Sequence, residues 1–167
     1  TNAELAVQVA FGKRVGVATI NEFDDESLAR VVRRAEELAR LAPENEEFVP
    51  AIGKQTYKPT PTYNAGIAAI TPEYRAQVAA DSINPCKNDG LIAAGFLSDS
   101  VGFFASANSN GNFAYQQSTG LDYTCTVRTE DGRGSGWVAS NVQGVADLDA
   151  GSDVQIAMRK AAHGVFV

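Results

Sequence analysis

The feature that most constrains the fold is a period-two alternation of apolar and polar residues, which recurs between residues 91 and 140. It is cleanest at residues 121–127, where every second residue is apolar. Successive side chains of a strand point to opposite faces of a sheet, so this pattern predicts strands that bury one face. The expected buried residues are Leu121, Tyr123, Cys125 and Val127, and the expected outward residues are Asp122, Thr124 and Arg128.

Short polar or glycine-containing turns separate these alternating segments. Antiparallel strands can be joined by such tight turns, whereas parallel strands need a crossover of roughly a dozen residues or more. The pattern therefore predicts an antiparallel meander. The expected strands span residues 91–97, 101–107, 113–117, 121–127 and 137–140. A further hairpin is expected near the start of the chain, where residues 5–11 and 15–20 flank Gly12-Lys13 and where Val15, Val17 and Thr19 continue the alternation.

Three helices are expected from their capping residues and from apolar residues at helical spacing. The first runs from Asp24-Asp25 to Pro43, the second from Thr71-Pro72-Glu73 to the turns at residues 84–90, and the third from between Asp149 and Asp153 to Gly164. The order of elements predicts an α+β protein, in which an antiparallel meander carries about three helices packed on it.

The length of 167 residues fits one domain of ordinary size. Residues 43–70 hold four of the six prolines, so we expect a connection between two sub-regions, residues 1–70 and 71–167. The chain starts with Thr1 and stops in an apolar run at residues 165–167, so we interpret it as a fragment of a longer protein. Such a fragment is expected to self-associate, through the sheet at residues 91–140 or through its C-terminal segment.

Composition and charge exclude several classes of function. Fourteen basic residues against twenty acidic ones give a net charge of −6, which argues against binding of nucleic acid. No apolar stretch is long enough to span a membrane. Two cysteines are too few for a disulfide scaffold, so a reducing compartment, the cytoplasm, is expected, although one pairing of the two stays open.

Few residues could carry catalytic chemistry. The chain has one histidine, His163, which we expect to cap the last helix. Cys86 and Cys125 lie 39 positions apart, with Cys125 expected in the core and Cys86 expected at the surface after Asn84-Pro85. Zinc needs several such ligands at suitable spacing. The sequence therefore predicts no catalytic residue, no metal ligand and no cofactor in this chain.

Four strings, in this order, resemble the TldD/PmbA family, also called modulators of DNA gyrase. They are Phe11 to Gly16, Glu36 to Pro43, Asn108 to Tyr115 and Gly136 to Ser140. The resemblance covers nearly the whole chain and implies a zinc peptidase family. In this family, subunits of the TldD type carry a His-Glu-x-x-x-His motif and a further Cys ligand in a C-terminal domain. That domain and the family's upstream helix have no counterpart in this sequence, so the resemblance is to the N-terminal and middle regions only.

The resemblance implies the non-catalytic N-terminal region of a cytoplasmic metallopeptidase, which shapes the substrate cavity and contacts other subunits. It also implies zinc in the missing domain, a peptide or unfolded polypeptide as substrate, and a homo- or hetero-oligomer with a subunit of the TldD or PmbA type. The cavity candidates are Asn108, Asn110, Tyr115 and Trp137. The alternatives are a metal-free, PmbA-like partner or peptide-binding module, and a stand-alone enzyme that uses Cys86 or Cys125.

Overall fold

The computed structural model describes residues 2–164, which form an α+β fold as expected. The chain divides into two compact units, Thr1–Ala51 and Ile52–Val167. The sequence places the end of the first sub-region at residue 70, whereas in the structure residues 52–70 belong to the second unit. The expectations about the C-terminal run at residues 165–167 lie outside the described residues.

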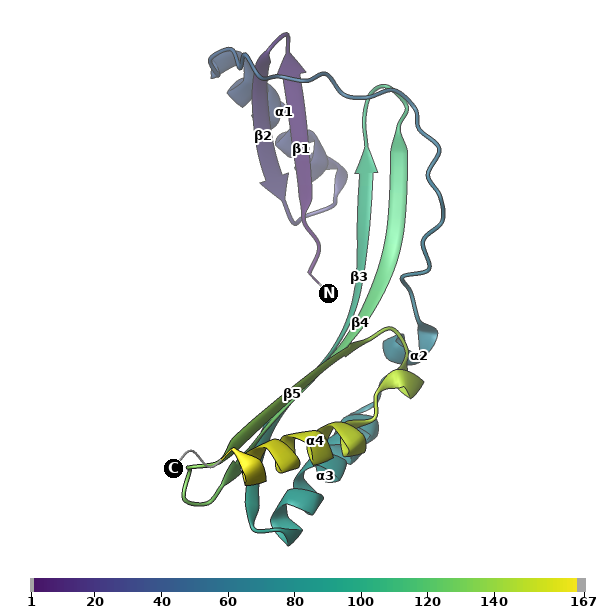
Figure 1. Cartoon of the computed structure of the whole chain (residues 1–167). Helices are drawn as coiled ribbons and strands as arrows, with labels where there is room; N and C mark the ends of the chain where they lie inside the picture. Colours follow the sequence, from purple (N-terminus) through teal and green to yellow (C-terminus); the bar gives the residue numbers. More distant parts are fainter. Residues whose placement is uncertain (1, 165–167) are drawn as a thin grey trace. The chain divides into compact units, whose positions relative to one another are not determined.

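The first unit is a hairpin packed against one helix (Figure 1). Strands β1 (Leu5–Phe11) and β2 (Arg14–Ile20) pair antiparallel, and helix α1 (Asp25–Leu41) follows. The side chain of Asp24 accepts a hydrogen bond from the Ser27 amide at 2.9 Å, which satisfies one of the free amides at the helix start. Both the hairpin and the capped helix confirm the sequence prediction.

The inward face of β2 is the opposite of the one that the alternation indicated. Val17 is 50% exposed, whereas Gly16 is buried against α1. A Cβ atom built on Gly16 would overlap the carbonyl oxygen of Ala35 and the backbone nitrogen of Ala39. Glycine therefore lets the helix backbone approach the strand, and this close approach selects the Gly16 face over the face with the larger valine.

The second unit contains a three-stranded antiparallel sheet in the order β3-β4-β5, which confirms the meander (Figure 1). The strands are β3 (Leu91–Ala107), β4 (Phe113–Thr129) and β5 (Ser135–Val142). The expected breaks at residues 98–100 and 118–120 are wrong, because Ser98 to Ser100 pair in register with Asp122 to Gly120. Four expected strands thus become two strands of 17 residues each.

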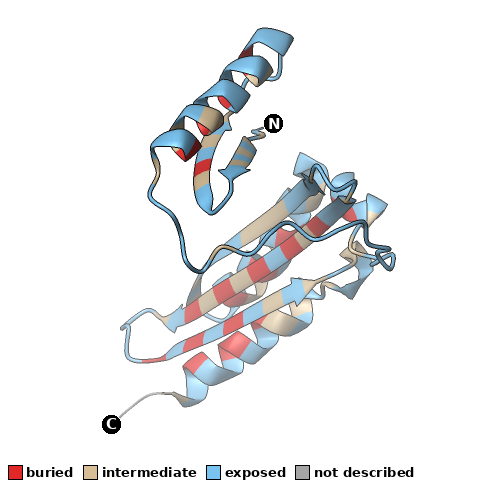
Figure 2. Cartoon of the chain, turned by 90° about the horizontal axis from the view of Figure 1, so that it is seen from above, coloured by how far each residue is buried: buried red, intermediate tan, exposed pale blue. Residues whose placement is uncertain are grey.

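Helices α3 (Pro72–Asn88) and α4 (Ala150–His163) pack on one face of this sheet. Their buried residues recur at helical spacing and meet the buried face of β4, where alternate residues are buried as predicted (Figure 2). The expected exposure of Cys86 is wrong, because α3 continues through Pro85 to Asn88 and Cys86 is fully buried. Two short helices, α2 (Ala65–Ala68) and the 3₁₀ helix η1 (Val145–Asp147), complete the unit.

The hairpin of β3 and β4 is longer than the rest of the sheet. Strand β5 pairs only with residues 121–128 of β4, so residues 101–107 and 113–119 form a two-stranded ribbon (Figure 1). We call this ribbon the arm. An extended segment, residues 52–64, runs beside it: Thr62 accepts a hydrogen bond from the Thr119 amide at 2.9 Å, and Asn108 donates one to the Ile52 carbonyl at 2.9 Å.

The buried face of β4 gives a direct stability test. Val127→Asp places a carboxylate at a position with no exposed surface, which costs several kcal/mol when the charge has no partner. We expect a loss of about 4 kcal/mol and a melting temperature lower by about 10 °C or more. The matched control is Ile92→Asp, on the same sheet but 56% exposed, which should stay within about 1 kcal/mol of the parent. Equal melting temperatures for both variants would contradict the register.

Candidate functional site

Two of the four cavity candidates lie in the turn at the tip of the arm. The Asn108 side-chain oxygen accepts hydrogen bonds from the amides of Asn110 and Asn112, both at 3.1 Å. Its side-chain nitrogen donates to Ile52. Asn108 therefore shapes the turn and fixes the extended segment, a positioning role that the pattern at residues 108–112 did not reveal.

The two aromatic candidates lie on opposite faces of the sheet. Tyr115 shares its face with the buried side chains of β4, and its ring stacks on Phe103 with centroids 6.3 Å apart. Trp137 pairs with Thr126, which places it on the face of the sheet opposite α3 and α4. We call this the open face. Tyr115 and Thr126 are eleven positions apart on β4, or about 36 Å of extended strand. The structure thus brings Asn108 and Asn110 together and leaves Trp137 apart from them.

A cavity of about 120 Å³ lies between α3 and the sheet. Its walls are mostly apolar, and at one side the Ser82 and Tyr123 hydroxyls form a buried hydrogen bond of 2.7 Å. Arg75 also lines it and makes a two-pronged ion pair with Asp99, with distances of 2.8 and 2.9 Å. Ligand sites commonly measure about 300–1,000 Å³, so this cavity suits a small apolar group and not a peptide.

The electrostatics of this region stabilise structure and do not activate a nucleophile. Burial raises the pKa of the Cys86 and Cys125 thiols, which disfavours the reactive thiolate. Burial also raises the pKa of Tyr123, against the opposing effect of its bond to Ser82. The Arg75 guanidinium lowers the pKa of Asp99. These side chains therefore argue against a stand-alone enzyme that uses Cys86 or Cys125 as its nucleophile.

The described residues do not fit a metal centre. Within residues 2–164, no three His, Cys, Asp or Glu side chains come together in a metal-binding group. A ring nitrogen of His163 lies 2.7 Å from the Arg159 carbonyl on the same helix, so this side chain caps α4 as expected. Both thiols are buried in the core.

Among residues 2–164, no helix has the length and apolar character needed to cross a membrane.

The open face of the sheet, opposite α3 and α4, carries exposed apolar side chains. Ile92, Phe96 and Trp137 lie on it, and each is more than half exposed. A shallow depression between Ile92, Ala94, Thr126 and Arg128 adds one positive charge. In the sequence, Ile92, Phe96 and Trp137 are apolar at alternate positions where a strand with one buried face would carry polar residues.

Two family models match the chain in order. The model described as PmbA/TldA metallopeptidase domain 1 matches residues 1–39, and the model described as the PmbA/TldA metallopeptidase central domain matches residues 67–164. No curated protein matches the chain in sequence.

Solved structures have the same fold at low sequence identity. TldE from Thermococcus kodakarensis is 18% identical, with a TM-score of 0.84 over 96% of this chain and 38% of that one. A candidate modulator of a DNA gyrase from Thermotoga maritima is 14% identical, with a TM-score of 0.84 over 96% and 37%. A candidate modulator of DNA gyrase from Bacteroides thetaiotaomicron is 20% identical, with a TM-score of 0.79 over 95% and 39%. The chain thus spans less than two fifths of the length of these relatives.

Buried thiols with raised pKa values lead to a prediction about reactivity. In the folded chain at pH 7.5, we expect Cys86 and Cys125 to react with a thiol reagent at least about 100-fold more slowly than a free cysteine, because both access and the thiolate fraction are reduced. Unfolding in guanidinium should release both thiols at once, which a colorimetric thiol assay can count. One fast-reacting thiol in the folded chain would show that Cys86 or Cys125 is accessible.

Proposed function

Because the chain belongs to the PmbA/TldD metallopeptidase family, we propose that it forms the non-catalytic N-terminal region of a peptidase of this family. In this role it lines a cavity for a peptide or unfolded polypeptide and contacts a neighbouring subunit of the TldD or PmbA type. The proposal includes a cytoplasmic location and no nucleic-acid partner, which the net charge of −6 supports.

The observation that carries the proposal is the ordered match of two domain models, 1–39 and 67–164, to a chain that spans only 37–39% of its solved relatives. The donor set of residues 2–164, which offers no metal-binding group, supports the assignment of catalysis to a region outside this chain. Zinc and the hydrolytic step then belong to the C-terminal domain of a longer protein.

The open face of the sheet is the surface we assign to the peptide. Extended polypeptides present apolar side chains and backbone amides, and the exposed Ile92, Phe96 and Trp137 offer apolar contacts of matching kind. Arg128 provides a positive charge at the edge of this face. The same face also supports the second candidate, a metal-free partner or peptide-binding module with no hydrolytic activity.

One test of the proposal concerns metal binding and catalysis. We expect the purified chain to hold less than about 0.1 zinc per molecule after dialysis and to cleave no unfolded polypeptide, because tetrahedral zinc needs three or four ligands in reach. Elemental analysis and a peptide-release assay measure both. Stoichiometric zinc that is lost on His163→Ala would overturn the assignment.

Another test of the proposal uses Trp137, the one tryptophan in the chain, as a reporter of the open face. Titration with a tryptophan-free extended peptide should shift its fluorescence in a saturable way. Phe96→Ser should weaken binding at least about fivefold, because it removes an exposed aromatic contact on that face. Phe113→Ser, with similar exposure but on the opposite face, near the tip of the arm, is the control and should bind as the parent does. Equal loss in both variants would contradict a site on the open face.

A further inference from the structure

We infer that the arm is a self-association surface whose partner is the arm of a second copy of this chain. The inference deepens the proposed subunit contact, on which its biological role rests, by naming the surface and the occupant. It stands on three independent features of the arm, which are its exposed apolar side chains, its lack of charge and its open strand edge.

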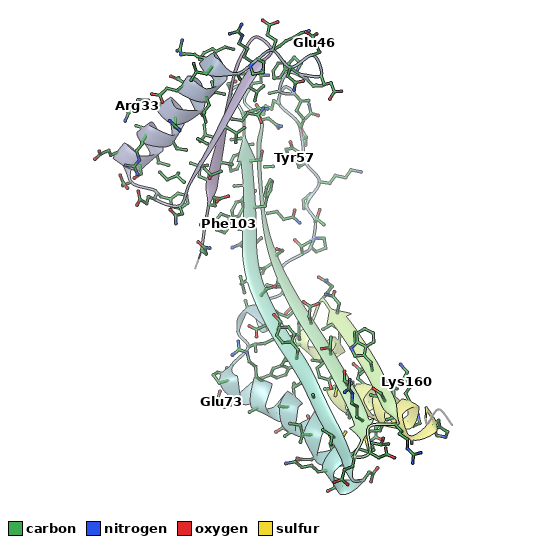
Figure 3. The ribbon with its side chains drawn as sticks, turned by 90° about the vertical axis from the view of Figure 1, so that its left-hand side faces the viewer. Arg33, Glu46, Tyr57, Glu73, Phe103 and Lys160 are labelled. Carbon is green, nitrogen blue, oxygen red and sulfur yellow. The ribbon has the colours of Figure 1, made fainter. Side chains whose placement is uncertain are left out.

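The arm exposes large apolar side chains on both of its faces. Figure 3 shows Phe103 on this ribbon, well away from α3 and α4. The arm and its extended segment carry seven large apolar side chains that are each 51% to 67% exposed. They are Val101, Phe103, Phe104, Phe113, Tyr115, Ile52 and Tyr57. At 150–250 Å² for an aromatic side chain, they present roughly 700 Å². Val101, Phe103, Phe113 and Tyr115 share one face of the ribbon, and Phe104 lies on the other, so this apolar surface is divided between two faces. Its total approaches the roughly 800 Å² that a standard interface buries on each partner.

The arm also lacks charge. Residues 101–119 contain no Asp, Glu, Lys, Arg or His, although charged residues make up 20% of the chain, which would give about four among these 19. Two molecules with a net charge of −6 can therefore bring their arms together without burying a charge. A strongly acidic or basic partner would gain no ion pair here, so the chemistry favours a partner that is equally apolar and uncharged. A second arm has this composition.

Within residues 2–164, no strand pairs with the outer edge of β3 along the arm. The other edge, on β4, is occupied where Thr62 accepts a hydrogen bond from the Thr119 amide. The Thr119 amide points away from β3. In an antiparallel pair, the residue directly opposite then points its own amide away from β4. Val101 is that residue, so its amide and those of every second residue along β3, including Ala105, point outward.

Natural edge strands are commonly blunted by lysine or proline, and β3 contains neither. Its single charge, on Asp99, lies outside the arm and is paired with Arg75. Antiparallel pairing of two β3 edges about a two-fold axis would join two arms into one four-stranded sheet, which is the self-complementary arrangement typical of dimers. In this pairing, the outward amides of each arm donate to carbonyl groups of the other arm.

Analytical ultracentrifugation of the whole chain from 1 µM to 1 mM tests the inference. We expect the mass to rise from 17.7 kDa toward twice that value as concentration increases. The double variant Phe103→Lys/Phe104→Lys should raise the dimer dissociation constant at least about 100-fold, because it places four positive charges in the interface. Ala105→Pro, which removes one outward amide, should raise it at least about tenfold.

The matched control is Phe96→Lys/Trp137→Lys, which changes two equally exposed aromatics on the open face and should dimerise as the parent does. Circular dichroism and melting confirm that each variant folds. A parent that stays monomeric at 1 mM, or a folded arm variant that dimerises like the parent, would overturn the inference, as would equal loss in the control. Zinc binding or peptide cleavage would instead refute the proposed function and would leave these masses unchanged.

Discussion

Both units depend on the same interaction, the close approach of a helix backbone to a glycine in a strand or directly before one. In the first unit Gly16 faces the helix at Ala35 and Ala39, and in the second Gly136 and Gly134 face α4 at Ala157 and Ala161. In each helix the two alanines are four residues apart and fully buried. A Cβ atom on any of these three glycines would overlap the helix backbone, so glycine at these positions allows the helix to pack this closely. This contact fixes which face of the strands becomes the core.

Local signals predicted those parts of the fold that local chemistry controls. The caps at Asp24, Thr71 and Asp149 begin their helices as expected, and alternate residues of β4 are buried from Leu121 to Val127. The failures occurred where tertiary contacts override the pattern. On β2, the smaller Gly16 faces the helix, whereas Val17 is exposed. Residues 98–100 are polar but remain part of β3, because they pair with residues of β4. Of the site candidates, only the asparagines at the arm tip come together, since strand register, which the sequence leaves open, places Trp137 on the other face.

These constraints also separate the surfaces available for function. Helices α3 and α4 cover one face of the sheet around the core, which leaves the opposite face, with Ile92, Phe96 and Trp137, open to a polypeptide. The arm projects past β5, where neither helix supplies buried side chains, and carries uncharged aromatic residues. Under the proposed function, the open face provides a wall for the peptide and the arm provides a subunit contact, while catalysis is assigned to a region outside this chain.

The helix-covered half of the sheet holds the second unit together, whereas the arm is a ribbon held by its own ladder and by residues 52–64. Amide hydrogen exchange, resolved to single residues in dilute and therefore monomeric protein, distinguishes these two parts. We expect the slowest exchange at residues 121–128 of β4, which have a strand on each side, and exchange at least about 100-fold faster at residues 101–107 and 113–118. Arm amides as slow as those of Leu121 to Val127 would contradict this expectation.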